Sequence, residues 1–544
     1  MKRNIGNDNT SFLSFFARQS MQLMRCRNHS FVFMAVMGML SFVGAAQAVT
    51  WTGATNGLWL TGTNWTGGTP AGATGVNLNA DLATFNNNTQ LTVTLNMTTA
   101  GGNYSLGAFE RIAGSTSNRV VNNVSGTSGV LTLNGVTRDT TAGGLNTTDV
   151  IIHQNTTAGT FTIGNAASGT LGISLPAAVD YKVVIDSISN VTIGSSIAGP
   201  GGITVLRAPS VTSLVLLSGN NSYARNTIVD SARLRAGGGN GIPNGSLAGN
   251  LILQGTAPQF GITASETING LSGNGAVDND GNTAVTMTVG DNDQSSIYSG
   301  NIINSSGNAN GTMSVVKVGD GTLTLSGSNT YVGTTTVNDG TLLVNGTHSG
   351  ILLTVPAPVA AYTIASGGTL GGIGTISAAV DLLGKISPGA SVGTLTVGGL
   401  TLQDDSSSVF ELINTAGAHA AGGGNDLISI TNALTVGALS PDFLIDIDAI
   451  GGGDLNNSGS WILAQYGSLN ALSAPNFTVT GVDLVNFTYS VGIVPDGVNP
   501  LGPGSVVLTL NPVPEPNSLI LLSIGAIGWV SGIRRRSRQE FLAG

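Results

Sequence analysis

The sequence predicts an all-β protein, mainly a parallel β-helix (a solenoid) with capping strands, followed by one C-terminal transmembrane helix. Apolar residues alternate with polar ones over short stretches bounded by glycine or asparagine, which is typical of half-buried strands. Related stretches recur along the chain, and such repetition favours a solenoid over a sandwich or a barrel. The 80 glycines suit tight corners, and a hydrophobic content of 41% is sufficient to form a core.

Residues 1–48 have the features of a signal peptide. An apolar run covers residues 31–43 and ends shortly before a small-x-small site. Three basic residues precede this run: Arg18, Arg25 and Arg27.

Signal cleavage is expected after Ala48, because Ala46 and Ala48 occupy the two small positions of the site. That cut would remove Cys26, the only cysteine. The exported chain would then contain no disulfide, thiol nucleophile or thiolate metal ligand.

The charge balance argues against two classes of partner. Only 9% of the residues are charged, and the net charge is −9. Nucleic acids and anionic lipid surfaces are bound mainly through Lys and Arg, so we expect neither as a partner of the exported region.

Alternation with period two predicts the strands. Phe161 and Ile163 share one face with Thr162 between them, and Leu323 and Leu325 share one face with Thr324 pointing outward. The same pattern occurs at three further pairs: Leu131 and Leu133, Val191 and Ile193, Leu395 and Val397. The outward threonines suit strands because they are polar and β-branched.

We divide the exported chain into four parts. Residues 49–115 are expected to form an N-terminal cap, residues 116–435 the β-helix with coils of about 20–25 residues, and residues 436–512 a C-terminal β cap of antiparallel strands. Residues 513–544 form the last part. The N-terminal cap is expected to use three tryptophans: Trp51, Trp59 and Trp65.

An internal repeat supports the solenoid. Residues 217–223 align with residues 325–331, so that Tyr223 matches Tyr331. The alignment continues without a gap through three pairs: Thr227 and Thr335, Val229 and Val337, Leu234 and Leu342.

These stretches resemble the autotransporter-associated β-strand repeat, also called the passenger-associated transport repeat. Residues 317–346 resemble it closely, residues 214–236 moderately and residues 366–380 loosely. The resemblance implies a right-handed parallel β-helix.

The C-terminal segment combines a proline-flanked acid, an apolar run and a basic cluster. The motif consists of Val513, Pro514, Glu515 and Pro516. The uncharged run after it would span about 24 Å as a helix, close to the roughly 30 Å of a bilayer core. Its anchoring residues are Leu519, Ile520, Leu521, Leu522, Ile524, Ile527, Trp529 and Val530, and its basic stop-transfer residues are Arg534, Arg535, Arg536 and Arg538.

This order resembles the PEP-CTERM sorting signal of Gram-negative bacteria that make exopolysaccharide. The resemblance implies an exosortase-like partner, a temporary inner-membrane tether through the C-terminal helix, cleavage near 514–516, and release to the cell surface or extracellular matrix. A permanent membrane anchor and a helix buried in a soluble core are the alternatives.

No catalytic residues are predicted. Asp404 and Asp405 would point to opposite faces of a strand, and Asp446 and Asp448 would mark a solvated face. The histidines of the exported chain are expected to be isolated on the surface: His153, His348 and His419.

No metal site is predicted with specific ligands, and no cofactor is expected. Calcium is the one ion with suitable oxygen ligands, in acidic turns at 278–282 and 291–293 and in a glycine-rich turn at 422–426. The alternative is that these Asp and Asn side chains cap their own turns.

We therefore expect an exported, non-enzymatic surface or extracellular-matrix protein, a rigid β-helical spacer or adhesin associated with exopolysaccharide or surface glycan. The alternative is a glycan-active β-helix enzyme, either a polysaccharide lyase or a hydrolase. A cleft with three or more converging Asp, Glu, Arg or Lys residues would favour the enzyme.

Overall fold

A computed structural model provides the fold, and the described residues all lie within one compact unit, Ala46–Gly544. The structure describes residues 48–51, 65, 82–85, 92–95, 103–112, 117–123, 128–156, 158–164, 170–208, 212–304, 311–350, 362–389, 391–421, 423–436, 442–471, 477–497 and 502–513. Over these ranges the chain contains strands and turns and no helix, which confirms the all-β prediction.

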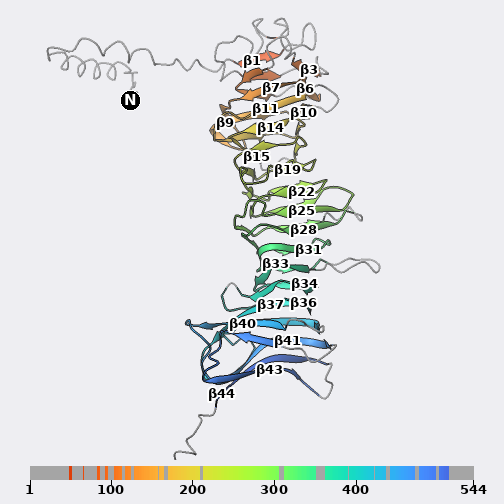
Figure 1. Cartoon of the computed structure of the whole chain (residues 1–544). Coiled ribbons are helices and arrows are strands. Elements are labelled where there is room, and N and C mark those ends of the chain that lie inside the picture. The colour runs from red at the N-terminus through yellow and green to blue at the C-terminus, as the bar shows by residue number, and fades with distance from the viewer. Residues whose placement is uncertain are drawn as a thin grey trace, which may run out of the picture. The chain divides into compact units, whose positions relative to one another are not determined.

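One continuous parallel ladder runs through the fold (Figure 1). Each strand in it pairs in parallel with the next strand of the series, which belongs to the following coil. The series is β1 (Ala48–Trp51), β2 (Leu82–Phe85), β5 (Ala108–Arg111), β9 (Gly144–Gln154), β12 (Asp180–Ile185), β15 (Gly202–Arg207), β18 (Thr227–Asp230), β20 (Leu251–Gln254), β23 (Leu271–Gly273), β26 (Ser296–Tyr298), β29 (Thr322–Leu325), β31 (Thr335–Val344), β33 (Tyr362–Gly372), β35 (Lys385–Pro388), β37 (Ser407–Ile413), β40 (Phe443–Ile450) and β42 (Phe477–Thr480).

Two further parallel sheets form the other faces of the N-terminal coils. The nine-stranded sheet contains β3 (Thr92–Leu95), β6 (Arg119–Asn123), β10 (Thr160–Ile163), β13 (Asn190–Ile193), β16 (Val215–Leu217), β19 (Arg233–Ala236), β21 (Gln259–Ile262), β24 (Ala276–Asn279) and β27 (Asn301–Asn304). The five-stranded sheet contains β4 (Asn103–Leu106), β7 (Ser128–Leu133), β11 (Thr170–Ser174), β14 (Ser196–Gly199) and β17 (Ser222–Tyr223).

Long strands join the faces in the C-terminal half. In β31, for example, Thr335 pairs with Val315 on one face, whereas Leu342 pairs with Leu323 on another. The register of β31 with β33 shifts between Val337 and Asp339. The remaining strands of this large sheet are β8 (Val136–Thr140), β22 (Glu266–Ile268), β25 (Val285–Val289), β28 (Met313–Lys317), β30 (Ser328–Asn329), β32 (Thr347–His348), β34 (Thr375–Leu382), β36 (Thr394–Leu402), β38 (Gly417–His419), β39 (Leu427–Val436), β41 (Gly459–Ala471), β43 (Phe487–Pro495) and β44 (Gly504–Pro512).

Successive coils place equivalent residues directly above one another. Ile203 pairs with Thr227, and Thr227 pairs with Leu251, which gives 24 residues for each of these two coils. Coil length varies, because Leu251 pairs with Leu271 after only 20 residues. These coils agree with the length expected from the sequence.

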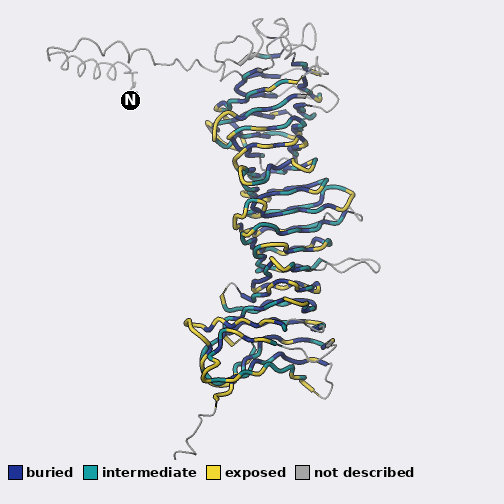
Figure 2. Tube along the Cα trace, viewed as in Figure 1, coloured by how far each residue is buried: buried dark blue, intermediate teal, exposed yellow. Residues whose placement is uncertain are grey.

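Inward-facing residues stack into columns that form the core. Buried positions recur along the trace from coil to coil (Figure 2). One column of the nine-stranded sheet is fully buried and follows the strand register through Val191, Val215, Leu234, Phe260, Val277 and Ile302. Towards the N-terminus the core becomes aromatic, and the ring centroids of Phe109 and Phe161 lie 5.5 Å apart. The predicted alternation is therefore observed as a continuous interior.

The parallel ladder extends beyond the limits predicted for the β-helix. Strands β1, β2 and β5 precede residue 116 and already pair in parallel, as do β40 and β42 after residue 435. Among the described residues of the predicted C-terminal cap, antiparallel pairing is limited to β44 with β41 and β43. The expectation that antiparallel strands form all of this cap is therefore corrected, since β40 and β42 continue the solenoid.

One outward position differs from expectation. Thr324 is only 9% exposed, because its register neighbours Ile297 and Leu343 flank it on the outer face. Thr324 is thus a covered position, whereas Leu325 is buried inside as predicted.

Among the described residues, no helix is long and apolar enough to cross a membrane. The predicted transmembrane segment lies outside those residues.

The inward and outward positions can be tested on two neighbours in β34. Val380 is fully buried and Ala379 is exposed. We expect Val380→Asp to lower the free energy of unfolding by about 3–5 kcal/mol because it buries an unpaired charge. Ala379→Asp should stay within about 0.5 kcal/mol of wild type. Equal losses in urea unfolding would contradict the assignment.

Candidate functional site

The two repeats share one local geometry. Tyr223 and Tyr331 are both fully buried. The Tyr223 hydroxyl lies 2.6 Å from Thr227 Oγ1, and the Tyr331 hydroxyl lies 2.6 Å from Thr335 Oγ1. This confirms that the two tyrosines occupy equivalent corners of their coils and explains why a threonine follows four residues later.

A buried asparagine two residues before each tyrosine joins neighbouring coils. Asn221 Oδ1 accepts the Ile197 amide at 2.9 Å, and its Nδ2 donates to the Gly241 carbonyl at 2.7 Å. Asn329 Oδ1 likewise accepts the Ile302 amide at 2.9 Å. The asparagine of the repeat therefore satisfies main-chain groups at a corner where the strands separate.

Removal of this bridge should destabilise the solenoid. Asn329→Ala is expected to lower the free energy of unfolding by about 1–3 kcal/mol, because the buried Ile302 amide loses its acceptor. Asn338→Ala, at an exposed position of β31, is the control and should change it by less than about 0.5 kcal/mol. A silent Asn329→Ala would show that the bridge is dispensable.

Two ionisable residues point into the coils. Lys317 Nζ donates to three main-chain carbonyls, at 2.6 Å to Val318, 2.6 Å to Gly319 and 3.2 Å to Asp339. Glu266 Oε1 accepts the Ile242 amide at 2.6 Å. Burial raises the pKa of Glu266 to about 7 and lowers that of Lys317. Both side chains bond to main-chain groups: Lys317 to two carbonyls of its own coil and one of the next, and Glu266 to an amide of the preceding coil.

His348 is buried, which corrects the prediction of an isolated surface histidine. Its ring stacks on Tyr331 with centroids 4.0 Å apart, and its Nδ1 lies 2.8 Å from the Tyr362 hydroxyl. Burial lowers its pKa. His348 is therefore part of the corner formed by the repeat, which sequence spacing does not reveal because Tyr362 lies one coil away.

His153 is also buried and lies between two carboxylates. Its Nδ1 is 3.1 Å from Glu110 Oε1, and its Nε2 is 2.9 Å from Asp186 Oδ2. Arg138, on the β8–β9 hairpin, also bonds to Glu110. Asp186 accepts the amides of residues 141 and 142 in the turn of that hairpin, each at 2.8 Å. The cluster holds the hairpin over the sheet.

The cluster favours the charged forms of its members. Burial opposes the charge of His153, but hydrogen bonds to Asp186 and Glu110 outweigh it and raise its pKa. Burial likewise opposes the charges of Glu110 and Asp186, while their bonds to His153 and other donors lower their pKa values.

This arrangement predicts a pH dependence of stability. The contribution of His153 to the free energy of unfolding is fully present below its ordinary pKa of 6.5. It is lost as the pH rises through the raised pKa of His153 in the folded protein. We expect the melting temperatures of wild type and His153→Gln to converge as pH rises above 6.5. Thermal unfolding from pH 5.5 to 9 measures this, and a constant difference would contradict it. The Glu110 and Asp186 contributions are lost on acidification instead.

His419 is partly exposed and stacks on Trp461, with ring centroids 5.0 Å apart. Its Nε2 lies 2.9 Å from the Thr415 carbonyl oxygen. It is therefore nearer the surface than the other two histidines but is packed rather than isolated.

A polar groove crosses the outer face of the nine-stranded sheet. Its edge is an ion-pair cluster in which Asp280 Oδ2 accepts from Arg233 Nη2 at 2.9 Å and from Arg235 Nε at 2.8 Å. Asp280 reaches these arginines across Gly261, where a Cβ would collide with its carboxylate. This cluster was not predicted from the sequence, because the partners are two coils apart and only the glycine indicates a close approach.

The groove has a volume of about 430 Å³. Besides Arg233 and Asp280, it is lined by Asp278 and Thr330, while Ala276 contributes a small side chain to it. Three charged residues thus converge on one groove, which is the feature that would favour a glycan-active enzyme. Asp280, however, is only 4% exposed and is held in two ion pairs.

The predicted acidic turns bind main-chain groups. Asn279 Oδ1 accepts the Gly281 amide at 2.9 Å, as in an Asx turn. Asp293 Oδ1 accepts the Asp320 amide at 3.0 Å, and Asp426 accepts the Glu411 amide at 2.7 Å. Across the described ranges, no group of three or more His, Cys, Asp or Glu is arranged to hold a metal ion.

The other predicted aspartates lie on the surface. Asp446 and Asp448 are exposed on the outer face of β40, which confirms the solvated face. Asp404 and Asp405 lie in the turn between β36 and β37, and Asp405 has a φ of 63°. The assumption that this pair lies in a strand is therefore wrong.

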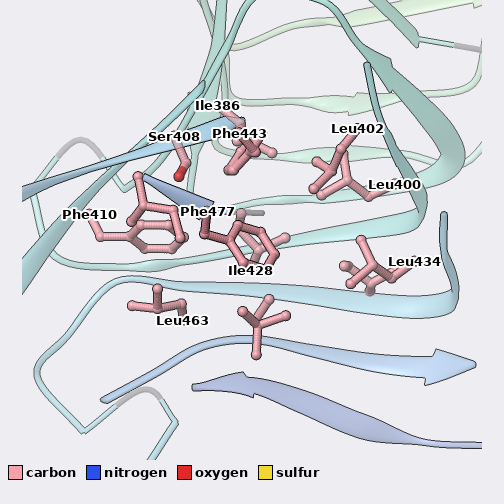
Figure 3. Close-up of a pocket in the computed structure, with 14 residues that line it drawn as sticks. Ile386, Leu400, Leu402, Ser408, Phe410, Ile428, Leu434, Phe443, Leu463 and Phe477 are labelled. Carbon is pink, nitrogen blue, oxygen red and sulfur yellow. The ribbon is translucent and has the colours of Figure 1, made fainter. Parts of the chain in front are cut away.

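An apolar cavity of about 40 Å³ lies inside the C-terminal coils (Figure 3). Phe410, Phe443 and Phe477 point towards it, together with aliphatic residues such as Ile428. Such a lining offers no charged group for chemistry, so we interpret the cavity as a packing defect where the solenoid meets the antiparallel strands.

Most residues of the predicted export signals lie outside the described part of the chain. Ala48 begins β1, and Ala46 is not among the described residues. Val513 directly follows β44, and its amide donates to the Asn486 carbonyl at 2.8 Å. Pro514, Glu515 and Pro516, the apolar anchor and the arginine cluster lie beyond it. The sorting motif therefore begins directly after the last described strand.

Two segments match known families. Residues 315–344 match the Passenger-associated-transport-repeat, and residues 512–536 match the PEP-CTERM protein-sorting motif. The chain carries both elements. The second implies processing by an exosortase-type sorting system and an exported, secreted or cell-surface location in Gram-negative bacteria. A comparison with curated proteins finds no matching relative.

Proposed function

We propose that the protein is a rigid, non-enzymatic spacer or adhesin of the cell surface or extracellular matrix, associated with exopolysaccharide. The observation that carries this proposal is the unbroken parallel ladder from β1 to β42, closed by antiparallel strands and followed directly by the sorting motif. Sixteen coil-to-coil steps of about 4.8 Å correspond to a stack about 77 Å long.

Several features support a mechanical role. Each coil is hydrogen-bonded to the next through the main chain, so that bending the stack would strain many bonds together. Few residues are charged, and the outer positions of the strands are often threonine, serine or asparagine. We take the coils to be right-handed, as in most parallel crossovers and as the repeat resemblance implies.

In this proposal the signal peptide starts export and the apolar segment around Leu521 then tethers the chain in the inner membrane. Arg534, Arg535, Arg536 and Arg538 hold the end of the tether on the cytoplasmic side. An exosortase-like enzyme cleaves near Glu515 and releases the solenoid to the surface. The proposal requires no cofactor; thermal unfolding in Ca²⁺ and in EGTA tests this, and a clear shift would reveal a calcium site.

A glycan-active enzyme is the second candidate, because Arg233, Asp278 and Asp280 converge on one groove. A hydrolase needs one carboxyl as acid and another as base or nucleophile. Asp280 instead bonds to two arginines, as expected of a structural ion pair. Release of reducing ends or unsaturated products from polysaccharides by the purified protein would favour the enzyme.

The sorting step has a direct test. Replacing Pro514, Glu515 and Pro516 together by alanine should leave the protein in the membrane fraction with an intact C-terminus, because the extended cleavage site is lost. Pro500→Ala, outside the motif, is the control and should be released normally. Fractionation and C-terminal mass spectrometry measure both. A released wild-type protein that keeps Arg534–Arg538 would show that cleavage near the motif does not occur.

A further inference from the structure

We propose that the groove on the outer face of β19, β21, β24 and β27 binds a neutral, hydroxyl-rich glycan chain that lies along the stack of coils. This inference rests on the proposed role at a glycan-bearing surface, and it names the site and the ligand class that such a role would use.

The groove arises from the order of side chains along the sheet. Register places Gln259, Ala276 and Asn301 above Arg233 in one outward column. In the next column, Gly261 lies between Arg235 and Asp278. The small Ala276 side chain leaves a hollow in the first column, and Gly261 in the second leaves room for the Asp280 carboxylate, which lines the hollow.

The length of the hollow suits a chain rather than a single small molecule. It extends from Arg233 on β19 to Thr330, whose amide donates to the Ile302 carbonyl of β27 at 2.9 Å. These are four coil-to-coil steps, or about 19 Å. Its volume of about 430 Å³ falls within the range of ligand sites, roughly 300–1,000 Å³.

The charges of the groove balance, although the chain as a whole is acidic. Arg233 lines the groove and Arg235 adjoins it through its ion pair with Asp280; together they oppose Asp278 and Asp280, so neither a polyanion nor a polycation would gain a large net Coulomb attraction. A neutral ligand with many hydroxyls avoids this limitation, because each hydroxyl both donates and accepts hydrogen bonds.

The groove offers both kinds of partner in fixed positions. The Arg233 side chain is 34% exposed, so its guanidinium retains access to the groove while one nitrogen bonds to Asp280. Gln259 and Thr330 contribute exposed groups that can donate or accept. Because Asp280 holds both arginines, little side-chain entropy remains to be lost on binding.

Binding can be measured with the full-length protein purified in detergent. The probes are maltohexaose, cellohexaose and mannohexaose as neutral chains, and hexagalacturonate as the acidic chain, each titrated by calorimetry. We expect at least one neutral hexasaccharide to bind more tightly than hexagalacturonate.

Two variants locate the site. Ala276→Trp fills the hollow from an outward position and should weaken binding at least tenfold, and Arg233→Gln should weaken it severalfold. Ala379→Trp, at an outward position of β34, is the matched control and should bind like wild type. Circular dichroism verifies folding, and Arg233→Gln decides the outcome if Ala276→Trp does not fold.

The proposal is overturned if no neutral chain binds, if hexagalacturonate binds more tightly, or if the groove variants bind like wild type. Its failure is distinct from failure of the proposed sorting. A protein that is cleaved near Glu515 but binds no glycan refutes the groove alone, whereas one that binds glycan but retains its arginine cluster refutes the sorting alone.

Discussion

The structure depends on one constraint: each coil must return to the position directly above the previous coil. When it does, the amides and carbonyls of a strand bond to the coils on either side, and the inward side chains form continuous columns. Corners have to meet the same requirement without strand pairing. At Gly273, which has a φ of 95° and lies against the Leu253 carbonyl, the missing side chain permits the turn. At Asn221 and Asn329, the side-chain oxygen accepts a main-chain amide of another coil.

The same constraint explains why polar residues are found inside the coils. Lys317 and Glu266 face inward where main-chain groups at corners have no strand partner, and they supply donors or an acceptor. Burying such groups is costly unless they are hydrogen-bonded. The His153 cluster applies this rule to the outer face, where it holds a hairpin against the sheet. These ionisable groups are therefore explained by architecture and do not require catalysis.

The outer surface has different requirements. Outward positions do not have to pack, so their side chains are available for interactions along the stack. The groove beside Asp280 shows how a single glycine, Gly261, lets side chains from different coils meet. The sorting motif begins directly after β44, so the strands and the export signal adjoin without an intervening described segment. A stack of coils followed by a sorting motif suits the spacer role proposed above.

The sequence alone determined the local features of this protein. Alternation at Phe161 and Ile163, the match of Tyr223 with Tyr331, and the motif starting at Val513 are all carried by residues close together in the chain. Contacts between coils were not determined in this way. His153 was expected at the surface, but Glu110 and Asp186 surround it from coils 43 and 33 residues away. Arg233 and Asp280 are 47 residues apart in the sequence and meet only because the stacking of coils brings them to the same face, two coil steps apart. The physical reason is that coil length varies, so which outward residues become neighbours depends on the accumulated register of the stack, and only the tertiary structure sets that register.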